Sequence, residues 1–85
     1  MLQAERLFDR DARVAHCLWV LSNPQLYPGF GPHIDISQEE IGHLAGLSRQ
    51  QTNQALHALQ EQGLLRIDYR GITVLDLPGL GAVGA

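Results

Sequence analysis

Residues 37–51 read SQEEIGHLAGLSRQQ, and they contain two helix-start signals in quick succession. In the first, the Ser37 hydroxyl is expected to accept a hydrogen bond from the backbone N–H of Glu40, while the Glu40 side chain accepts one from the N–H of Ser37. The serine-to-glutamine pattern that begins at Ser48 repeats this capping box. Gly46 stands between the two, where a residue in the left-handed conformation would end the first helix. The sequence therefore predicts a helix of about two turns, a short link and a second helix.

The two helices are predicted to pack against each other. The inward-facing residues expected for the second helix, about residues 48–62, share helical spacing: Thr52, Ala55, Leu56 and Leu59. Those expected for the first helix are Ile41, Leu44 and Ala45. Because the link is only Gly46 and Leu47, the helices must cross sharply, which is typical of a helix-turn-helix.

The hydrophobic period changes from helix to strand after Gly63, which is expected to end the second helix. Leu65 and Ile67 alternate with polar residues, as do Ile72 and Val74 later in the chain. A short glycine-containing link, Tyr69-Arg70-Gly71, joins the two runs and predicts a β-hairpin. Residues 78–85 are rich in glycine and lack periodicity, so we expect a flexible C-terminal tail.

A further helix is predicted ahead of this region, over residues 10–22. Apolar residues recur there at helical spacing, and Asp9 stands in front as a candidate N-cap. Residues 1–8 could be the last two turns of another helix, whereas residues 23–32 are dense in proline and glycine and predict a loop. Residues 33–36 alternate polar with apolar and predict a short strand. Together the elements predict a mainly α fold with a small β-hairpin wing, a winged helix-turn-helix.

Length and composition indicate one soluble globular domain. The chain has 85 residues, of which 45% are hydrophobic and 18% charged. No apolar run approaches the roughly 20 residues that span a bilayer, and no signal peptide is recognisable, so we expect a cytoplasmic protein with no membrane contact. The single cysteine, Cys17, is expected to be a small buried thiol.

The outer face of the second helix suggests nucleic-acid recognition, although the net charge of −3 argues against it. In a helix-turn-helix the second helix lies in the major groove, with its N-terminal residues at the base edges. The polar residues expected there, our candidates for base contacts, are Arg49, Gln50, Asn53 and Gln54, with His57 one turn later. The candidates for phosphate contacts at the helix starts are Ser37, Ser48 and Gln51, and Arg70 is the candidate at the hairpin tip.

The chain resembles the C-terminal winged helix-turn-helix domain of the cyclic-AMP receptor protein and FNR (Crp/Fnr) family of bacterial transcription regulators. The most specific part of the resemblance is residues 36–50, followed by Ala55-Leu56, Leu59 and Gly63-Leu64-Leu65; Arg13-Val14-Ala15 and Leu7-Phe8-Asp9 are similar to the family's first helix and hinge. The resemblance implies that Arg49, Gln50 and Gln54 touch bases and that Gln38, Ser48 and Gln51 touch phosphates. Gln54 stands where arginine is common in the family.

The resemblance also implies a domain division and a set of partners. Residues 1–8 would be the stub of a dimerisation helix, residues 9–77 the DNA-binding domain and residues 78–85 the tail. The expected partners are double-stranded DNA, a second copy of the full-length protein and, as a further candidate, RNA polymerase. No cofactor is expected in this chain, because a cyclic nucleotide or other signal would bind an N-terminal domain that this sequence lacks.

Two other classes of function stay open at this point. One is a winged helix that binds another protein without reading DNA, which the acidic balance favours. The other is an enzyme, which we do not expect. The four histidines lie on different predicted elements: His16, His33, His43 and His57. Two carboxylate pairs, Asp9 with Asp11 and Glu39 with Glu40, lie at predicted helix starts, where capping and the helix dipole already account for them. We therefore predict neither a catalytic residue nor a metal ligand.

Overall fold

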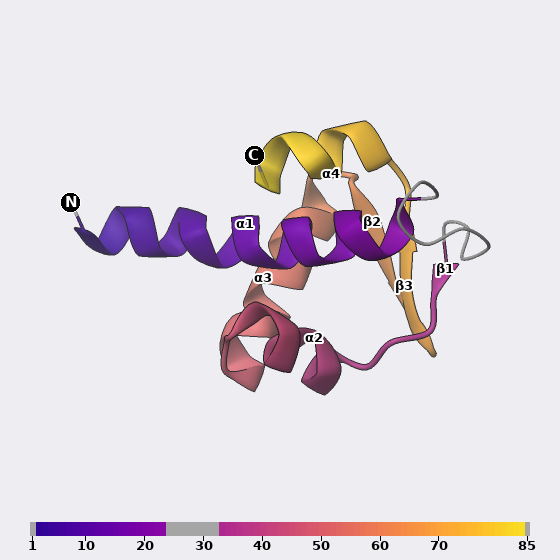
Figure 1. The fold of residues 1–85 in the computed structure, drawn as a ribbon, viewed down its shortest axis with the longest axis horizontal. Coiled ribbons are helices and arrows are strands. Elements are labelled where there is room, and N and C mark those ends of the chain that lie inside the picture. Colours follow the sequence, from indigo (N-terminus) through magenta and orange to yellow (C-terminus); the bar gives the residue numbers. More distant parts are fainter. Residues whose placement is uncertain (1, 24–32, 85) are drawn as a thin grey trace.

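The computed structural model describes residues 2–23 and 33–84, and within them it has four helices and a three-stranded sheet (Figure 1). In chain order the elements are α1 (Leu2–Ser22), β1 (His33–Ile34), α2 (Gln38–Ala45), α3 (Arg49–Glu61), β2 (Leu65–Asp68), β3 (Gly71–Val74) and α4 (Leu77–Gly84). The predicted winged helix-turn-helix is confirmed. Most of the loop predicted over residues 23–32 lies outside the described residues.

The sheet is antiparallel and has the order β1-β3-β2. The hairpin of β2 and β3 is the predicted wing, with Ile67 opposite Ile72. The strand predicted over residues 33–36 is confirmed in a shorter form, because only His33 and Ile34 pair with β3. β1 therefore attaches the segment before α2 to the wing, so that the helix pair and the hairpin share one framework.

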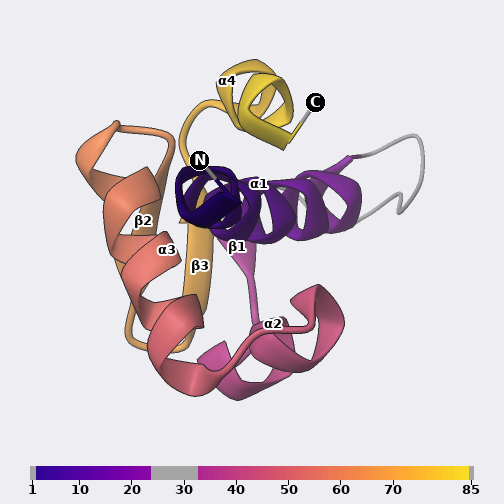
Figure 2. The same cartoon turned by 90° about the vertical axis from the view of Figure 1, so that its left-hand side faces the viewer.

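The core lies where α1, α3, α4 and the sheet meet. In Figure 2, α1 runs between α4 above and α2 below, with α3 and the sheet beside it. The largest fully buried side chains include one or more from each of these elements: Val14, Leu18, Ile41, Thr52, Leu56, Leu59, Leu65, Ile72 and Leu80. Burying this apolar surface supplies the main driving force for the fold.

The first helix is longer than predicted, and the proposed N-cap at Asp9 is wrong. α1 runs without a break from Leu2 to Ser22, so Asp9 lies inside it. An aspartate favours a helix start only where the preceding residues are not helical. Residues 2–8 contain neither glycine nor proline, and they extend a helix whose later turns are packed on the core. The dimerisation role of residues 1–8 stays a prediction.

The prediction of a flexible tail is also wrong, because residues 77–84 form helix α4. Asp76 caps this helix, since its Oδ1 accepts the N–H of Gly79 at 3.1 Å. Leu80 is fully buried. A Cβ on Gly81 would lie 2.6 Å from Nε1 of Trp19 in α1, so the glycine permits a close approach of the two helices. Tertiary packing thus stabilises a segment whose glycines disfavour helix.

One predicted core position on α2 is exposed. Ile41 is fully buried and Ala45 half-buried, but Leu44 is 62% exposed and the prediction that it faces inward is wrong. The apolar face of this short helix is therefore narrower than its sequence suggests. No helix among the described residues is both long and apolar enough to cross a membrane.

We predict that Leu80→Ala lowers the free energy of unfolding by about 2 to 5 kcal/mol, because it leaves a cavity under α4. The matched control is Leu44→Ala, which removes the same atoms from an exposed site and should change stability by about 0.5 kcal/mol or less. Urea denaturation of both variants measures the difference. Equal stabilities for the two variants would contradict the packing of α4.

Candidate nucleic-acid interface

Both predicted capping boxes form, and they place the starts of α2 and α3 on one side of the molecule. Ser37 Oγ accepts the Glu40 N–H at 3.1 Å, and the Glu40 carboxylate accepts the Ser37 N–H at 3.0 Å. At α3 the reciprocal bonds between Ser48 and Gln51 are both 3.1 Å. Each serine hydroxyl keeps its own hydrogen, and the Gln51 amide keeps its NH2 group, so both remain donors for an anion.

The turn between the two helices is tight because of two glycines. Gly46 has φ 72°, in the left-handed region, and its N–H bonds the carbonyl of Gly42, as does the N–H of Leu47 at 2.9 Å. Gly42 itself is buried against α3, where an added Cβ would lie 2.9 Å from Thr52 Oγ1. Thr52 cannot yield easily, since it is fully buried and its hydroxyl donates to the Ser48 carbonyl at 2.8 Å. Gly42 therefore sets how closely α2 crosses α3.

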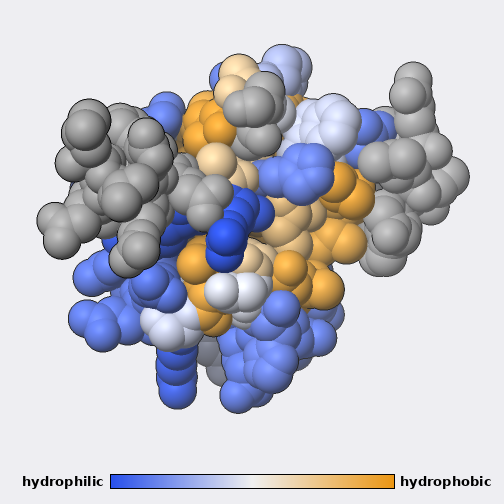
Figure 3. Space-filling model, turned by 60° about the vertical axis from the view of Figure 1, so that its left-hand side comes forward, coloured by the Kyte–Doolittle hydropathy of each residue, from blue (hydrophilic) through white to orange (hydrophobic). Residues whose placement is uncertain are grey.

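The division of α3 into an inner and an outer face is confirmed. The four residues predicted to face inward are all fully buried: Thr52, Ala55, Leu56 and Leu59. Of the predicted outer residues, Arg49, Gln50, Gln54 and His57 are exposed and Asn53 is half-buried. Hydrophilic side chains gather over the lower part of the molecule, which α2 and α3 form in this orientation (Figure 3).

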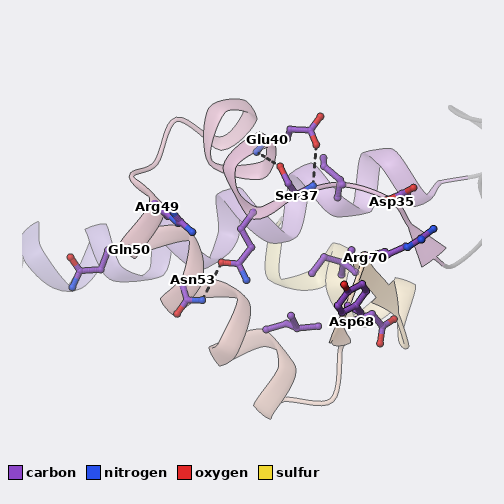
Figure 4. Close-up of a pocket in the computed structure, with 14 residues that line it drawn as sticks. Asp35, Ser37, Glu40, Arg49, Gln50, Asn53, Asp68 and Arg70 are labelled. Carbon is purple, nitrogen blue, oxygen red and sulfur yellow. Dashed lines mark hydrogen bonds between the residues drawn. The ribbon is translucent and has the colours of Figure 1, made fainter.

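Two of the outer side chains of α3 already hold partners in the protein. Asn53 Nδ2 donates to Gln38 Oε1 of α2 at 3.1 Å, a bond drawn in Figure 4. Gln54 Oε1 accepts a hydrogen bond from Arg10 Nη1 of α1 at 2.9 Å. The sequence analysis did not anticipate the second bond, because nothing local relates residues so far apart in the chain. Arg49 and Gln50, at the first turn, are the outer residues nearest the free end of α3.

The tip of the wing is the other exposed part of this side. Tyr69 is fully exposed and Arg70 is exposed beside it, between β2 and β3. Gly71 follows at a position with no room for a side chain, because a Cβ there would lie 2.0 Å from the Ile34 carbonyl oxygen. The close contact with β1 thus fixes where the hairpin turns and where Arg70 stands.

A polar network next to the tip of the wing joins all three strands. Asp68 on β2 accepts a hydrogen bond from Arg66 Nε at 2.8 Å and another from the Thr73 hydroxyl. His33 on β1 completes it, with Nδ1 3.0 Å from Thr73 Oγ1 and 3.5 Å from Asp68 Oδ2. The Arg66 bond, followed by the Thr73 bond, lowers the pKa of the Asp68 carboxyl. The Arg66 guanidinium is therefore paired with the Asp68 carboxylate within the protein.

A groove of about 930 Å³ lies between the wing and the starts of α2 and α3 (Figure 4). Arg49 and Arg70 line it from opposite sides, so both helix starts and the wing tip border one open space. Asp35, Glu40 and Asp68 also line it. The Glu40 carboxylate is part of the capping box, where hydrogen bonds from Ser37 lower its pKa. The negative charge of Asp68 is balanced by the hydrogen-bonded guanidinium of Arg66.

The other groups considered from the sequence do not converge. Within residues 2–23 and 33–84, no three His, Cys, Asp or Glu side chains are placed to hold a metal ion together. Cys17 is half-buried, and burial raises the pKa of its thiol, which disfavours the reactive thiolate.

Comparison with known proteins agrees with this geometry. The profile of the Crp-like helix-turn-helix domain matches residues 12–83. The chain belongs to that family. Over 55 residues, or 65% of its length, the Crp-like domain is 42% identical to a cyclic AMP receptor protein of Thermus thermophilus. It also matches the crystal structure of the Thermus thermophilus catabolite activator protein, with a TM-score of 0.85 and 31% identity over 98% of the chain.

The Crp-like domain is a DNA-binding domain of the kind found in transcription regulators, a family that is not a class of enzymes. The chain spans 24% of the length of the curated relative and 37% of that of the solved structure.

We predict that Gly42→Ala destabilises the Crp-like domain by about 1 to 2 kcal/mol, although alanine is the better helix former. The added methyl group overpacks the contact with Thr52 by more than the gain in helix propensity. His43→Ala, on the exposed side of the same helix, is the control and should be close to neutral. Thermal unfolding of both variants is the measurement, and a stabilised G42A would show that α2 can shift away from α3.

We predict that the wing network makes stability depend on pH in the acid range. The lowered pKa of Asp68 means that its ionised form stabilises the folded state above its ordinary pKa of 3.8, and that this contribution is lost as pH falls through the folded-state value. Asp68→Asn should therefore be less stable than the parent chain at pH 7, and the difference should shrink below about pH 4. Asp35→Asn is the control outside the network, and a difference for D68N that is constant with pH would contradict this.

Proposed function

We propose that this chain reads a specific sequence in double-stranded DNA, with α3 in the major groove, as part of a transcription regulator. The observation that carries the proposal is the exposed polar front of α3, which begins at a helix N-terminus beside an open groove. Arg49 can donate hydrogen bonds to guanine O6 and N7 together, and Gln50 lies next to Arg49 in the first turn of α3. Asn53 and Gln54 would follow one turn later.

Phosphate contacts would position the domain without a large positive charge. The hydroxyl hydrogens of Ser37 and Ser48, and the amide NH2 groups of Gln38 and Gln51, are donors at the starts of α2 and α3. Helix N-termini favour anions through their backbone N–H groups and dipole. Arg70 would hold a phosphate from the wing. Because most of these donors are uncharged, a domain with a net charge of −3 can still bind a polyanion on one face.

In the full-length protein, we propose that two copies act together on a two-fold symmetric site. A helix-turn-helix dimer reads half-sites one helical turn apart, about 34 Å. The first part of α1 is the proposed dimerisation segment, because it continues the helix beyond the domain core. The sequence similarity to a cyclic AMP receptor protein supports a regulator of this type.

We predict that Arg49→Ala costs about 1 to 3 kcal/mol of discrimination between the preferred sequence and random DNA. Arg70→Ala should instead weaken binding to all duplexes alike and reduce the salt dependence of log K by about one ion. The preferred sequence is first selected from a random duplex pool, and affinities are then measured by competition at several salt concentrations.

The control is Glu61→Gln, at the far end of α3, which should leave the base preference unchanged. Equal losses on specific and random duplexes for both arginine variants would contradict the division of roles. If the parent chain binds no duplex at low salt, the proposed function itself fails and the rival, a winged helix for protein contact, takes its place.

A further inference from the structure

Arg10 connects α1 to the DNA-facing side of α3. α1 crosses beside α3 (Figures 1 and 2), and the Arg10 side chain, 18% exposed, donates Nη1 to Gln54 Oε1 at 2.9 Å. Its Nε donates to Asp11 Oδ1 at 3.0 Å, which holds the guanidinium in place. Gln54 is exposed, whereas Arg10 is mostly covered. A charged group from outside the helix pair is therefore fixed against a predicted base-reading residue.

This bond fixes which end of the Gln54 amide is engaged. A guanidinium has five N–H donors and no acceptor, so the amide oxygen must face Arg10. The oxygen then keeps only one of its two lone pairs for a ligand, whereas both N–H groups of the Gln54 amide can still donate to one. The hydrogen bond between Asn53 and Gln38 does not determine the orientation of either amide group, since each amide could donate to the other.

We propose that Arg10 is a positioning residue that sets the base preference of Gln54, turning it from an adenine reader into a hydrogen-bond donor. The proposal rests on the proposed function. A glutamine that reads adenine uses its oxygen to accept from N6 while its NH2 donates to N7. With Arg10 on the oxygen, the amide presents its donor to a base edge with acceptors, such as guanine O6 and N7 or thymine O4.

The charge of Arg10 acts in the same direction. The amino group of adenine carries partly positive hydrogens, so a guanidinium beside the amide oxygen opposes their approach. The carbonyl oxygens of guanine and thymine are attracted by the same charge. Arg10 thus favours acceptor-rich edges through the orientation of Gln54 and through its own field.

The experiment compares the base preference of the 85-residue chain with that of variants at residues 10 and 54. Each protein selects sequences from a random duplex pool, and duplexes with single base changes then compete for binding. The base pair that Gln54 reads is the one whose preference disappears in Gln54→Ala. At that pair the parent chain should prefer guanine or thymine over adenine by roughly three- to tenfold, the worth of one hydrogen bond.

The variants separate positioning from a general effect of charge. Arg10→Met keeps an unbranched apolar stem but removes the guanidinium, and it should move the preference toward adenine at that pair alone. Arg10→Lys retains a charged donor and should largely keep the parent preference. Gln54→Glu replaces the amide donor with an acceptor and should move the preference toward cytosine, whose N4 donates. The double variant R10M/Q54A should match Q54A, because Arg10 acts through Gln54.

Arg13→Met removes the same charge from another site on α1 and is the matched control, with no expected change in preference. An unchanged preference in R10M, or an equal loss of affinity on every duplex, overturns the inference. If R10M does not fold, as judged by its thermal melt, R10K and Q54E decide in its place. A parent chain with no preference at any base pair would instead overturn the proposed function.

Discussion

The close crossing of α2 and α3 at Gly42 and Thr52 is the constraint on which the rest of this structure depends. The absence of a side chain at Gly42 lets the two backbones approach, and the buried Thr52 hydroxyl bonds the Ser48 carbonyl in the same place. Both helices can therefore begin on one side of the molecule with their serine caps outward. Apolar burial beneath them, by α1 and the sheet, holds this arrangement but does not determine its angle.

The consequence for recognition is a surface rich in hydrogen-bond donors and poor in net charge. The caps consume the acceptors of Ser37, Ser48 and Gln51 and leave their donor hydrogens, which suits a phosphate. Of the three acidic groups that line the groove, Glu40 is engaged in its cap and Asp68 with Arg66, while Asp35 is exposed. The net charge of −3 thus describes the whole chain and says little about this face.

The side chains that meet on this face come from several elements. The wing is held by His33, Asp68 and Thr73 from three different strands, and the front of α3 is contacted by Gln38 from α2 and Arg10 from α1. Asn53 and Gln54, two of the residues proposed to read bases, therefore do not act as independent side chains on a solvent-exposed helix. Their available donors and acceptors depend on neighbours from two other helices, α2 and α1.

The sequence by itself determined the elements whose causes are local. Capping boxes, the glycine at the end of α2 and the change of period after Gly63 each act over a few residues, so the helix pair, the hairpin and the outer face of α3 were predictable. Only the tertiary structure decided the continuous α1, the helix α4, the exposure of Leu44 and the bond between Arg10 and Gln54. Local rules disfavoured a glycine-rich helix and suggested a break at Asp9. Packing of α4 against Trp19 and the core outweighed the low helix propensity of its glycines, about 1 kcal/mol per residue or less, and residues 2–8, without glycine or proline, let α1 continue through Asp9. Contacts between residues distant in the chain leave no periodic trace in it, and so they appear only when the elements come together.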